Sequence, residues 1–208
     1  MWSAIGVAVL SGIYVGVGAV GVLMRPPGLG PLVQVDPYLA VLEFLIIPSA
    51  VALVTMMAAV YACASPQKKT HGLIALAFII AFALLTCGTH FVSLTLGRQI
   101  SSSALPQVSH QLSMVTWPTT ALALDLLAWD FFLGLSLLWA APVFRGDRQQ
   151  DTLRTVMFAA GLLCLIGLAA PLSGYMWLQV SAIIGYAFVL PVVCVLLARL
   201  FRKELLLE

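Results

Sequence analysis

Charged and polar residues are rare along this chain and gather between long apolar runs. A helix needs about 20 consecutive apolar residues to cross a hydrocarbon core of ~30 Å. Several segments reach that length, so the pattern predicts an all-α, polytopic integral membrane protein built as a bundle of six transmembrane helices. The predicted spans cover residues 3–24, 38–63, 72–97, 117–141, 155–173 and 176–200.

The connections between these runs are short, except for residues 25–37 and 98–116. The first of the two is rich in Pro and Gly and has little capacity for a helix. The second is long enough to form a cap or a short interfacial helix. Spans five and six are joined only by Gly174, Tyr175 and their neighbours, which predicts a tight hairpin. We find no internal repeat or low-complexity tract and interpret residues 1–208 as one transmembrane domain.

The first apolar run begins without a basic region and is longer than a signal-peptide core, so we expect it to be a retained span. It carries Ala8, Gly12 and Gly16 at intervals of four. Small residues at this spacing let another helix approach closely. We expect this stripe to serve packing within the chain. A homo-oligomer formed through Gly12 and Gly16 is the alternative.

Composition excludes a soluble fold. Hydrophobic residues make up 62% of the chain and charged residues 9%, with a mean hydropathy of +1.08. Soluble domains carry roughly 45–50% apolar and about 25% charged residues. The net charge of +2 is small and the basic residues lie in short clusters, so we expect no nucleic-acid partner. The four cysteines all lie in apolar segments without metal-like spacing, as buried hydrophobic residues would.

The distribution of basic residues predicts the orientation, because cytoplasmic loops of membrane proteins are enriched in Lys and Arg. In a six-span arrangement only Arg25 and Arg98 fall on one side. Both termini are therefore expected in the cytoplasm, in a plasma membrane of the bacterial type. The basic residues on the opposite, cytoplasmic side are Lys68, Lys69, Arg145, Arg148, Arg154, Arg199, Arg202 and Lys203.

Ionisable residues inside the apolar runs are the candidates for chemistry. A charge at the bilayer centre costs ~2.5–3.5 kcal/mol on insertion scales, so such residues often mark a site. Glu43, His90 and Asp125 are expected at similar depth in the outer half of the membrane, and Asp130 lies deeper. We take these four as the catalytic candidates. Structural hydrogen bonding between helices is the alternative role for each of them.

Residues near these four are the candidates for ligand binding. Thr86 is four residues before His90 and therefore shares its helix face, whereas Asp125 and Asp130 are separated by ~140° around an ideal helix. One aspartate is expected to meet the cluster around His90, and the other a different helix, with Tyr186 as a candidate partner. Arg98 is placed to pair with Glu43 or Asp125. The ligand-binding candidates are Thr86, Thr89, Phe91, Trp129 and Arg98.

These residues favour a membrane-embedded enzyme of isomerase, cyclase or lyase type that acts on a small lipid-like or isoprenoid-like substrate. A carboxyl group in a low-dielectric site can stay protonated at neutral pH and donate a proton, with His90 or Glu43 as the complementary base. The alternatives are a non-catalytic sensor or assembly subunit and a small ion- or proton-coupled transporter. No nucleotide or redox motif is found, so no cofactor is expected. No metal is expected either, although His90, Asp125 and Glu43 could together bind one.

Overall fold

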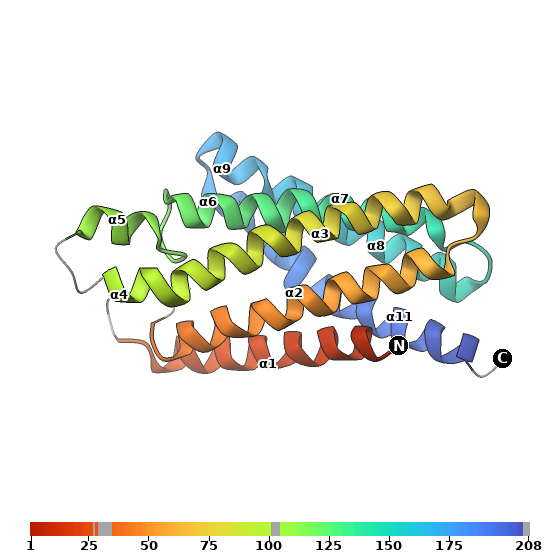
Figure 1. Cartoon of the computed structure of the whole chain (residues 1–208), viewed down its shortest axis with the longest axis horizontal. Helices are drawn as coiled ribbons and strands as arrows, with labels where there is room; N and C mark the ends of the chain where they lie inside the picture. The colour runs from red at the N-terminus through yellow and green to blue at the C-terminus, as the bar shows by residue number, and fades with distance from the viewer. Residues whose placement is uncertain (27, 29–34, 101–104, 206–208) are drawn as a thin grey trace.

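The fold was analysed in a computed structural model that describes residues 1–26, 28, 35–100 and 105–205 (Figure 1). All regular secondary structure in this part of the chain is helical. Six of its helical segments are long and apolar enough to cross a membrane, which confirms the predicted number of spans by length and composition. They are Trp2–Met24, Tyr38–Cys63, Pro66–Ile100, Thr120–Val143, Arg148–Ser173 and Met176–Arg202.

The first two of these segments are single helices, and the other four are made of consecutive helical pieces. The first three segments contain α1 (Trp2–Met24), α2 (Tyr38–Cys63), and then η1 (Pro66–Lys68), α3 (Lys69–Val92), η2 (Ser93–Gly97) and α4 (Arg98–Ile100). After the short helix α5 (Pro106–Gln111) come α6 (Thr120–Leu126), η3 (Leu127–Phe132), α7 (Leu133–Ala140), η4 (Ala141–Val143), α8 (Arg148–Gly167), α9 (Ala169–Ser173), η5 (Met176–Leu178), α10 (Gln179–Ile183), η6 (Ile184–Val189) and α11 (Leu190–Leu205).

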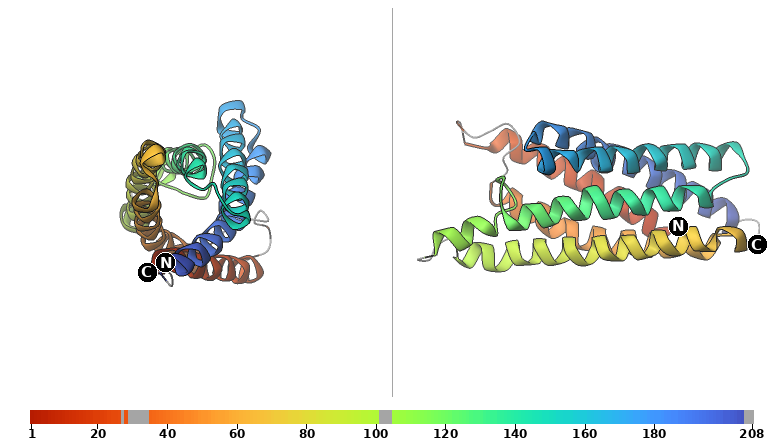
Figure 2. Two further views of the ribbon diagram at one scale, coloured as in Figure 1. Left: turned by 90° about the vertical axis from the view of Figure 1, so that its right-hand side faces the viewer. Right: turned by 90° about the horizontal axis from the view of Figure 1, so that it is seen from above.

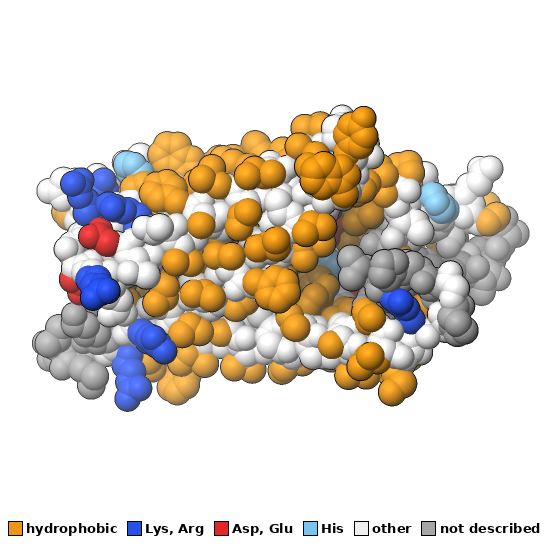
Figure 3. All heavy atoms as spheres, turned by 180° about the vertical axis from the view of Figure 1, so that it is seen from behind, with side chains coloured by type: hydrophobic (Ala, Val, Ile, Leu, Met, Phe, Trp, Pro, Cys, Tyr) orange, Lys and Arg blue, Asp and Glu red, His pale blue; other side chains and the backbone are white. Residues whose placement is uncertain are grey.

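The six segments form a ring in chain order (Figure 2). Each packs against its neighbour in the sequence, and α11 closes the ring by packing against α1. The sixth segment is inclined, because its first part, α10, packs against α8 while α11 reaches α1. Because the chain runs through six spans, both of its ends lie toward the same end of the bundle (Figure 1). We call this the basic end, because Lys and Arg side chains gather there (Figure 3).

The hairpins follow from local sequence. Lys69 donates from its ammonium group to the carbonyl oxygens of Tyr61 and Ala62, at 2.8 and 2.9 Å, and so satisfies the C-terminus of α2. Asp147 accepts from the backbone N–H of Gln150 at 2.9 Å and caps α8. The fifth span therefore begins before its apolar run, earlier than predicted. The tight hairpin before the sixth span is confirmed, with Gly174 in the left-handed region at φ 79°.

Three spans contain a π-helical segment, which the sequence pattern does not reveal. These segments are η2, η3 and η6, and all lie in the half of the bundle away from the basic end. π-Helical turns widen a helix locally and occur frequently at functional sites. In η6 the widened turn directly precedes Pro191, whose ring nitrogen cannot donate a hydrogen bond. Pro48 interrupts its span less, since α2 continues through it as a single helix.

The two ends of the ring are packed differently. Large apolar side chains fill the interior toward the basic end, including Leu53, Met57, Phe82, Leu137 and Leu197, all fully buried or nearly so. Toward the other end the buried residues include most of the polar ones. The candidate site described below lies in that second region.

Glycines on the fourth, fifth and sixth spans allow close packing, whereas Gly12 and Gly16 on α1 do not have this role. A Cβ atom added at Gly161 would lie 2.7 Å from Leu138 and 2.8 Å from the carbonyl oxygen of Gly134. One added at Gly12 or Gly16 meets no described atom within 4 Å. The expectation that this stripe packs closely within the chain is therefore wrong at Gly12 and Gly16, whereas Ala8 packs against the core.

The connections at the end of the bundle opposite the basic end are described in part. Residues 98–116 contain the helix α5, as the length of this connection allows, although residues 101–104 lie outside the described part. Most of the Pro- and Gly-rich connector between the first two spans also lies outside it.

Candidate functional site

Asp125 and His90 meet across the interface between α6 and α3. The Nε2 atom of His90 lies 3.4 Å from Oδ1 of Asp125, and the two side chains are 5% and 14% exposed. The distance places them together as an ion pair when the imidazole is protonated, but neither ring nitrogen has a hydrogen-bond partner among the described residues. A buried imidazole without a hydrogen-bond partner is unusual, because buried polar groups are nearly always hydrogen-bonded.

Asp125 is held by two further side chains. Its Oδ1 atom accepts from the indole Nε1 of Trp129 at 3.1 Å and, in a long contact of 3.5 Å, from the hydroxyl of Thr86. The indole is itself wedged between Phe82 and Tyr186, with ring centroids 4.9 Å from each. The carboxylate is therefore fixed beside His90 by groups on its own span and on α3.

These residues line a cavity of about 590 Å³ inside the ring. Its walls are mainly apolar, and every span except the fifth contributes to them. Val15 of α1 and Val180 of α10, which are 43% and 52% exposed, lie in the wall. Because the sixth span leans away from α1 at this end, the cavity reaches the apolar flank, where a hollow is visible in Figure 3. The polar side chains in the walls are Ser11, Tyr14, Glu43, Ser49, His90, Asp125, Gln179 and Tyr186.

Glu43 belongs to the same cavity but is fully engaged. It is 2% exposed, and its two oxygens accept from Ser93 and from the guanidinium Nη1 of Arg98, each at 2.7 Å. The other guanidinium nitrogen of Arg98 binds Asp36 at 2.9 Å. Of the two carboxylates considered for Arg98, the structure thus pairs it with Glu43. Glu43 is therefore buried together with its counter-charge.

Asp130 is separate from the pair formed by His90 and Asp125. It is completely buried in η3, and its Oδ1 atom accepts from Gln179 of the sixth span at 3.0 Å, while Oδ2 has no described partner. The two aspartates therefore meet different helices, as their angular separation predicts. The hydrogen-bond partner on the sixth span is Gln179, not Tyr186. Asp130 does not line the cavity, although Gln179 does.

Two of the ligand-binding candidates point elsewhere. Phe91 is 60% exposed and does not line the cavity, because it follows His90 by one residue and so lies about 100° around α3. Thr89 is buried, but its hydroxyl donates to the backbone carbonyls of Leu85 and Thr86 at 3.0 and 3.1 Å. Among these candidates, Trp129 lines the cavity, Thr86 holds Asp125, and Arg98 holds Glu43.

Sequence reasoning missed three residues of the site. Tyr14 lines the cavity from α1, Gln179 lines it from α10, and Ser93 holds Glu43 from η2. A signal was present for Gln179, because an amide side chain in an apolar span must find a partner. Tyr14 gave a weaker signal, since its ring is largely apolar and also packs among apolar side chains.

The arrangement suits proton transfer better than metal binding. In the described part of the chain, no three His, Cys, Asp or Glu side chains come close enough to hold a metal ion. Glu43, the third residue considered for such a site, is already bound to Arg98. His90 beside a fixed carboxylate can instead accept and return a proton, because the carboxylate stabilises the imidazolium form.

Comparison with known proteins finds no family model, no curated protein and no solved structure that matches the chain.

Proposed function

We propose that the protein is a multi-pass membrane protein that binds a small lipophilic molecule in the 590 Å³ cavity and transforms it by acid/base chemistry. The observation that carries this proposal is the buried imidazole of His90, which faces this apolar cavity without a hydrogen-bond partner among the described residues. Ligand sites are typically apolar cavities of ~300–1,000 Å³ with a few convergent polar groups. An imidazole nitrogen left unpaired in such a wall is available to a ligand.

His90 is the proposed base and Asp125 the residue that orients it. A proton taken from the ligand by His90 leaves an imidazolium 3.4 Å from the Asp125 carboxylate, which stabilises that charge. Trp129 and Thr86 hold the carboxylate in place. The apolar walls suit a hydrocarbon body, and the opening in the flank allows entry directly from the lipid.

The cavity lies in the outer half of the membrane in this proposal, with both termini in the cytoplasm. Support comes from the gathering of Lys and Arg at the end of the bundle that carries both termini. Reporter fusions at the N- and C-termini test the orientation. Cytoplasmic signals are expected from both, and an external signal from either one would contradict it.

The test of the site is native mass spectrometry of the protein purified in mild detergent. Wild type is expected to retain a lipophilic ligand, and Asp125→Ala and His90→Gln are expected to weaken its binding by about tenfold or more, as for a lost hydrogen bond to a charged group. Asp36→Ala is the control, because Asp36 is 56% exposed and does not line the cavity.

The identified ligand then decides between binding and catalysis. Product formation from it, lost in His90→Gln, supports the enzyme. A ligand that binds unchanged supports the sensor function instead. A wild-type protein without ligand, or variants that retain it fully, would contradict the assignment of the site to His90 and Asp125.

Assembly through α1 is a second candidate property, and a specific observation favours it. Gly12 and Gly16 are exposed, and α1 is the least buried of the six spans. Only 11% of the residues in its most apolar stretch are buried. Small residues on a lipid-facing helix let a second copy approach closely. Gly12→Leu is expected to shift a dimer to monomer in native mass spectrometry, with Val9→Leu as control. A monomeric wild type would contradict this proposal.

A further inference from the structure

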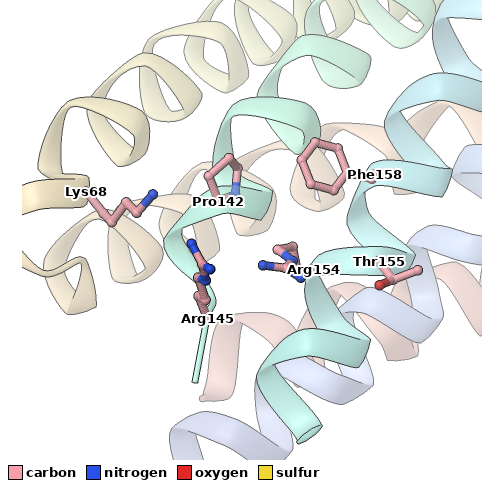
Figure 4. A pocket seen from close by; sticks show the side chains of 6 residues that line it. All are labelled: Lys68, Pro142, Arg145, Arg154, Thr155 and Phe158. Atoms are coloured by element: carbon pink, nitrogen blue, oxygen red, sulfur yellow. The ribbon is translucent and has the colours of Figure 1, made fainter. Parts of the chain in front are cut away.

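A second pocket lies at the basic end, formed by the connections between spans two and three and between spans four and five (Figure 4). It has a volume of about 430 Å³. The six residues that line it are Lys68, Pro142, Arg145, Arg154, Thr155 and Phe158. Three of the six are cationic, and they come from three separate segments of the chain.

The cationic groups face a shared space. Figure 4 shows the guanidinium groups of Arg145 and Arg154 turned toward each other, with the Lys68 side chain extended toward Pro142 on the same side of the pocket. Like charges that face one shared space repel one another, and an anion bound between them relieves this repulsion. Among the described residues, neither Lys68 nor Arg145 has a carboxylate within salt-bridge distance.

The nearby carboxylates leave most of this positive charge uncompensated. Asp151 lies 3.4 Å from Arg154, one turn away on the same helix, in an exposed pair of small energetic weight. Asp147 accepts from the N–H of Gln150 as the cap of α8. Thr155 already donates its hydroxyl to the carbonyl of Asp151 at 2.9 Å, so the cations remain the donors for a ligand.

The apolar part of the pocket indicates how an anion would be attached to the rest of its molecule. Phe158 follows Arg154 by four residues, which places its ring on the same face of α8 one turn farther from the basic end. The ring is 37% exposed. Charge at the end of the bundle and an exposed apolar ring one turn deeper match a headgroup and the beginning of its acyl chain.

We propose that this pocket binds a phosphate anion, presented by the headgroup of an anionic lipid. Arg recognises phosphate through paired N–H donors, and Lys contributes a point charge. Basic pockets between transmembrane helices on the cytoplasmic side bind such headgroups. This site lies at the basic end, shares no lining residue with the cavity of His90 and Asp125, and does not depend on the function proposed for them.

Native mass spectrometry of the delipidated protein with added phosphatidylglycerol tests the proposal, with phosphatidylcholine of the same acyl chains as the reference lipid. The double variant Lys68→Gln, Arg145→Gln is expected to bind phosphatidylglycerol more weakly, by about fivefold for each cation removed. Its matched control is Arg199→Gln, Arg202→Gln, which removes equal charge at the same end outside the pocket.

The double variant Lys68→Arg, Arg145→Lys keeps both positive charges and is expected to keep the affinity for phosphatidylglycerol. This control distinguishes the loss of charge from a disruption of the fold. Equal losses in the pocket variant and the control, or no preference for phosphatidylglycerol over phosphatidylcholine, would overturn the proposal. Inorganic phosphate identifies the source of the anion. If it displaces the lipid from wild type at low concentration, the pocket serves a soluble phosphate compound; if it does not, the acyl chain is part of the ligand.

Discussion

Glu43 and Asp125 are two buried carboxylates in the wall of one cavity, yet their surroundings differ. Both oxygens of Glu43 accept short hydrogen bonds, one from Ser93 and one from Arg98. Asp125 has one ordinary hydrogen bond, from Trp129, one long one from Thr86, and the imidazole of His90 at 3.4 Å without a hydrogen bond.

The difference distinguishes a structural ion pair, at Glu43, from a group that can still bind a ligand, at Asp125 and His90. A buried charge with an opposite charge and full hydrogen bonding is stable as it stands, and it joins the helices that carry it. Glu43 and Arg98 thus join α2 to the end of the third span that lies away from the basic end. A buried group with an unused hydrogen-bonding position lowers the stability of the empty protein. A ligand that hydrogen-bonds to it removes this cost and so binds more tightly.

Breaking the Glu43 pair has the largest expected effect on stability. Arg98→Met leaves the Glu43 carboxylate buried without its counter-charge, which is expected to lower the unfolding free energy by about 3 kcal/mol. Denaturation of the purified protein in mixed micelles measures it. The double variant Arg98→Met, Glu43→Gln is expected to recover most of the loss. Equal losses in the single and double variants would show that the ion pair itself is not what stabilises this region.

Asp130 offers an intermediate case, because one of its oxygens is bound by Gln179. Gln179→Leu leaves the buried carboxylate without a described donor and is expected to cost about 1–3 kcal/mol of unfolding free energy. Replacing both residues, in Gln179→Leu, Asp130→Leu, removes the unsatisfied group and is expected to restore stability. A double variant as unstable as the single one would contradict this account.

Asp125→Asn is expected to change the unfolding free energy by less than about 1 kcal/mol, because the asparagine oxygen still accepts from Trp129. Retained lipophilic ligand is expected to fall in the same preparation. The two measurements together sharpen the contrast with Arg98→Met. A large loss of stability with the ligand retained would make Asp125 a structural residue like Glu43.

The smallest effect is expected at the exposed end of the same ion-pair network. Asp36 is 56% exposed and binds the outer guanidinium nitrogen of Arg98 at 2.9 Å. Asp36→Asn is expected to cost about 0.5 kcal/mol or less, and added salt should reduce the difference further. A cost near that of Arg98→Met would place the stabilising contact at Asp36 instead of Glu43.

Much of the fold could be predicted because each span is long, apolar and bounded by local signals. The second span was predicted at both ends, since Tyr38 follows a proline and Cys63 precedes a polar turn. The fifth was predicted too short, because its first turns are polar and lie outside the apolar run. Periodicity also predicted that Asp125 and Asp130 meet different helices. It did not predict the π-helical segments, since widened turns depend on contacts between helices.

The sequence by itself determined the number of spans, the basic end, and the four ionisable residues placed among apolar ones. These follow from composition along one dimension and from the cost of charge in hydrocarbon. Only the tertiary structure decided that Arg98 forms its ion pair with Glu43 and that the His90 nitrogens have no hydrogen-bond partner among the described residues. It also decided that Tyr14 and Gln179 line the cavity. The rotation and tilt of each helix settle these pairings, and they depend on how all six spans pack together.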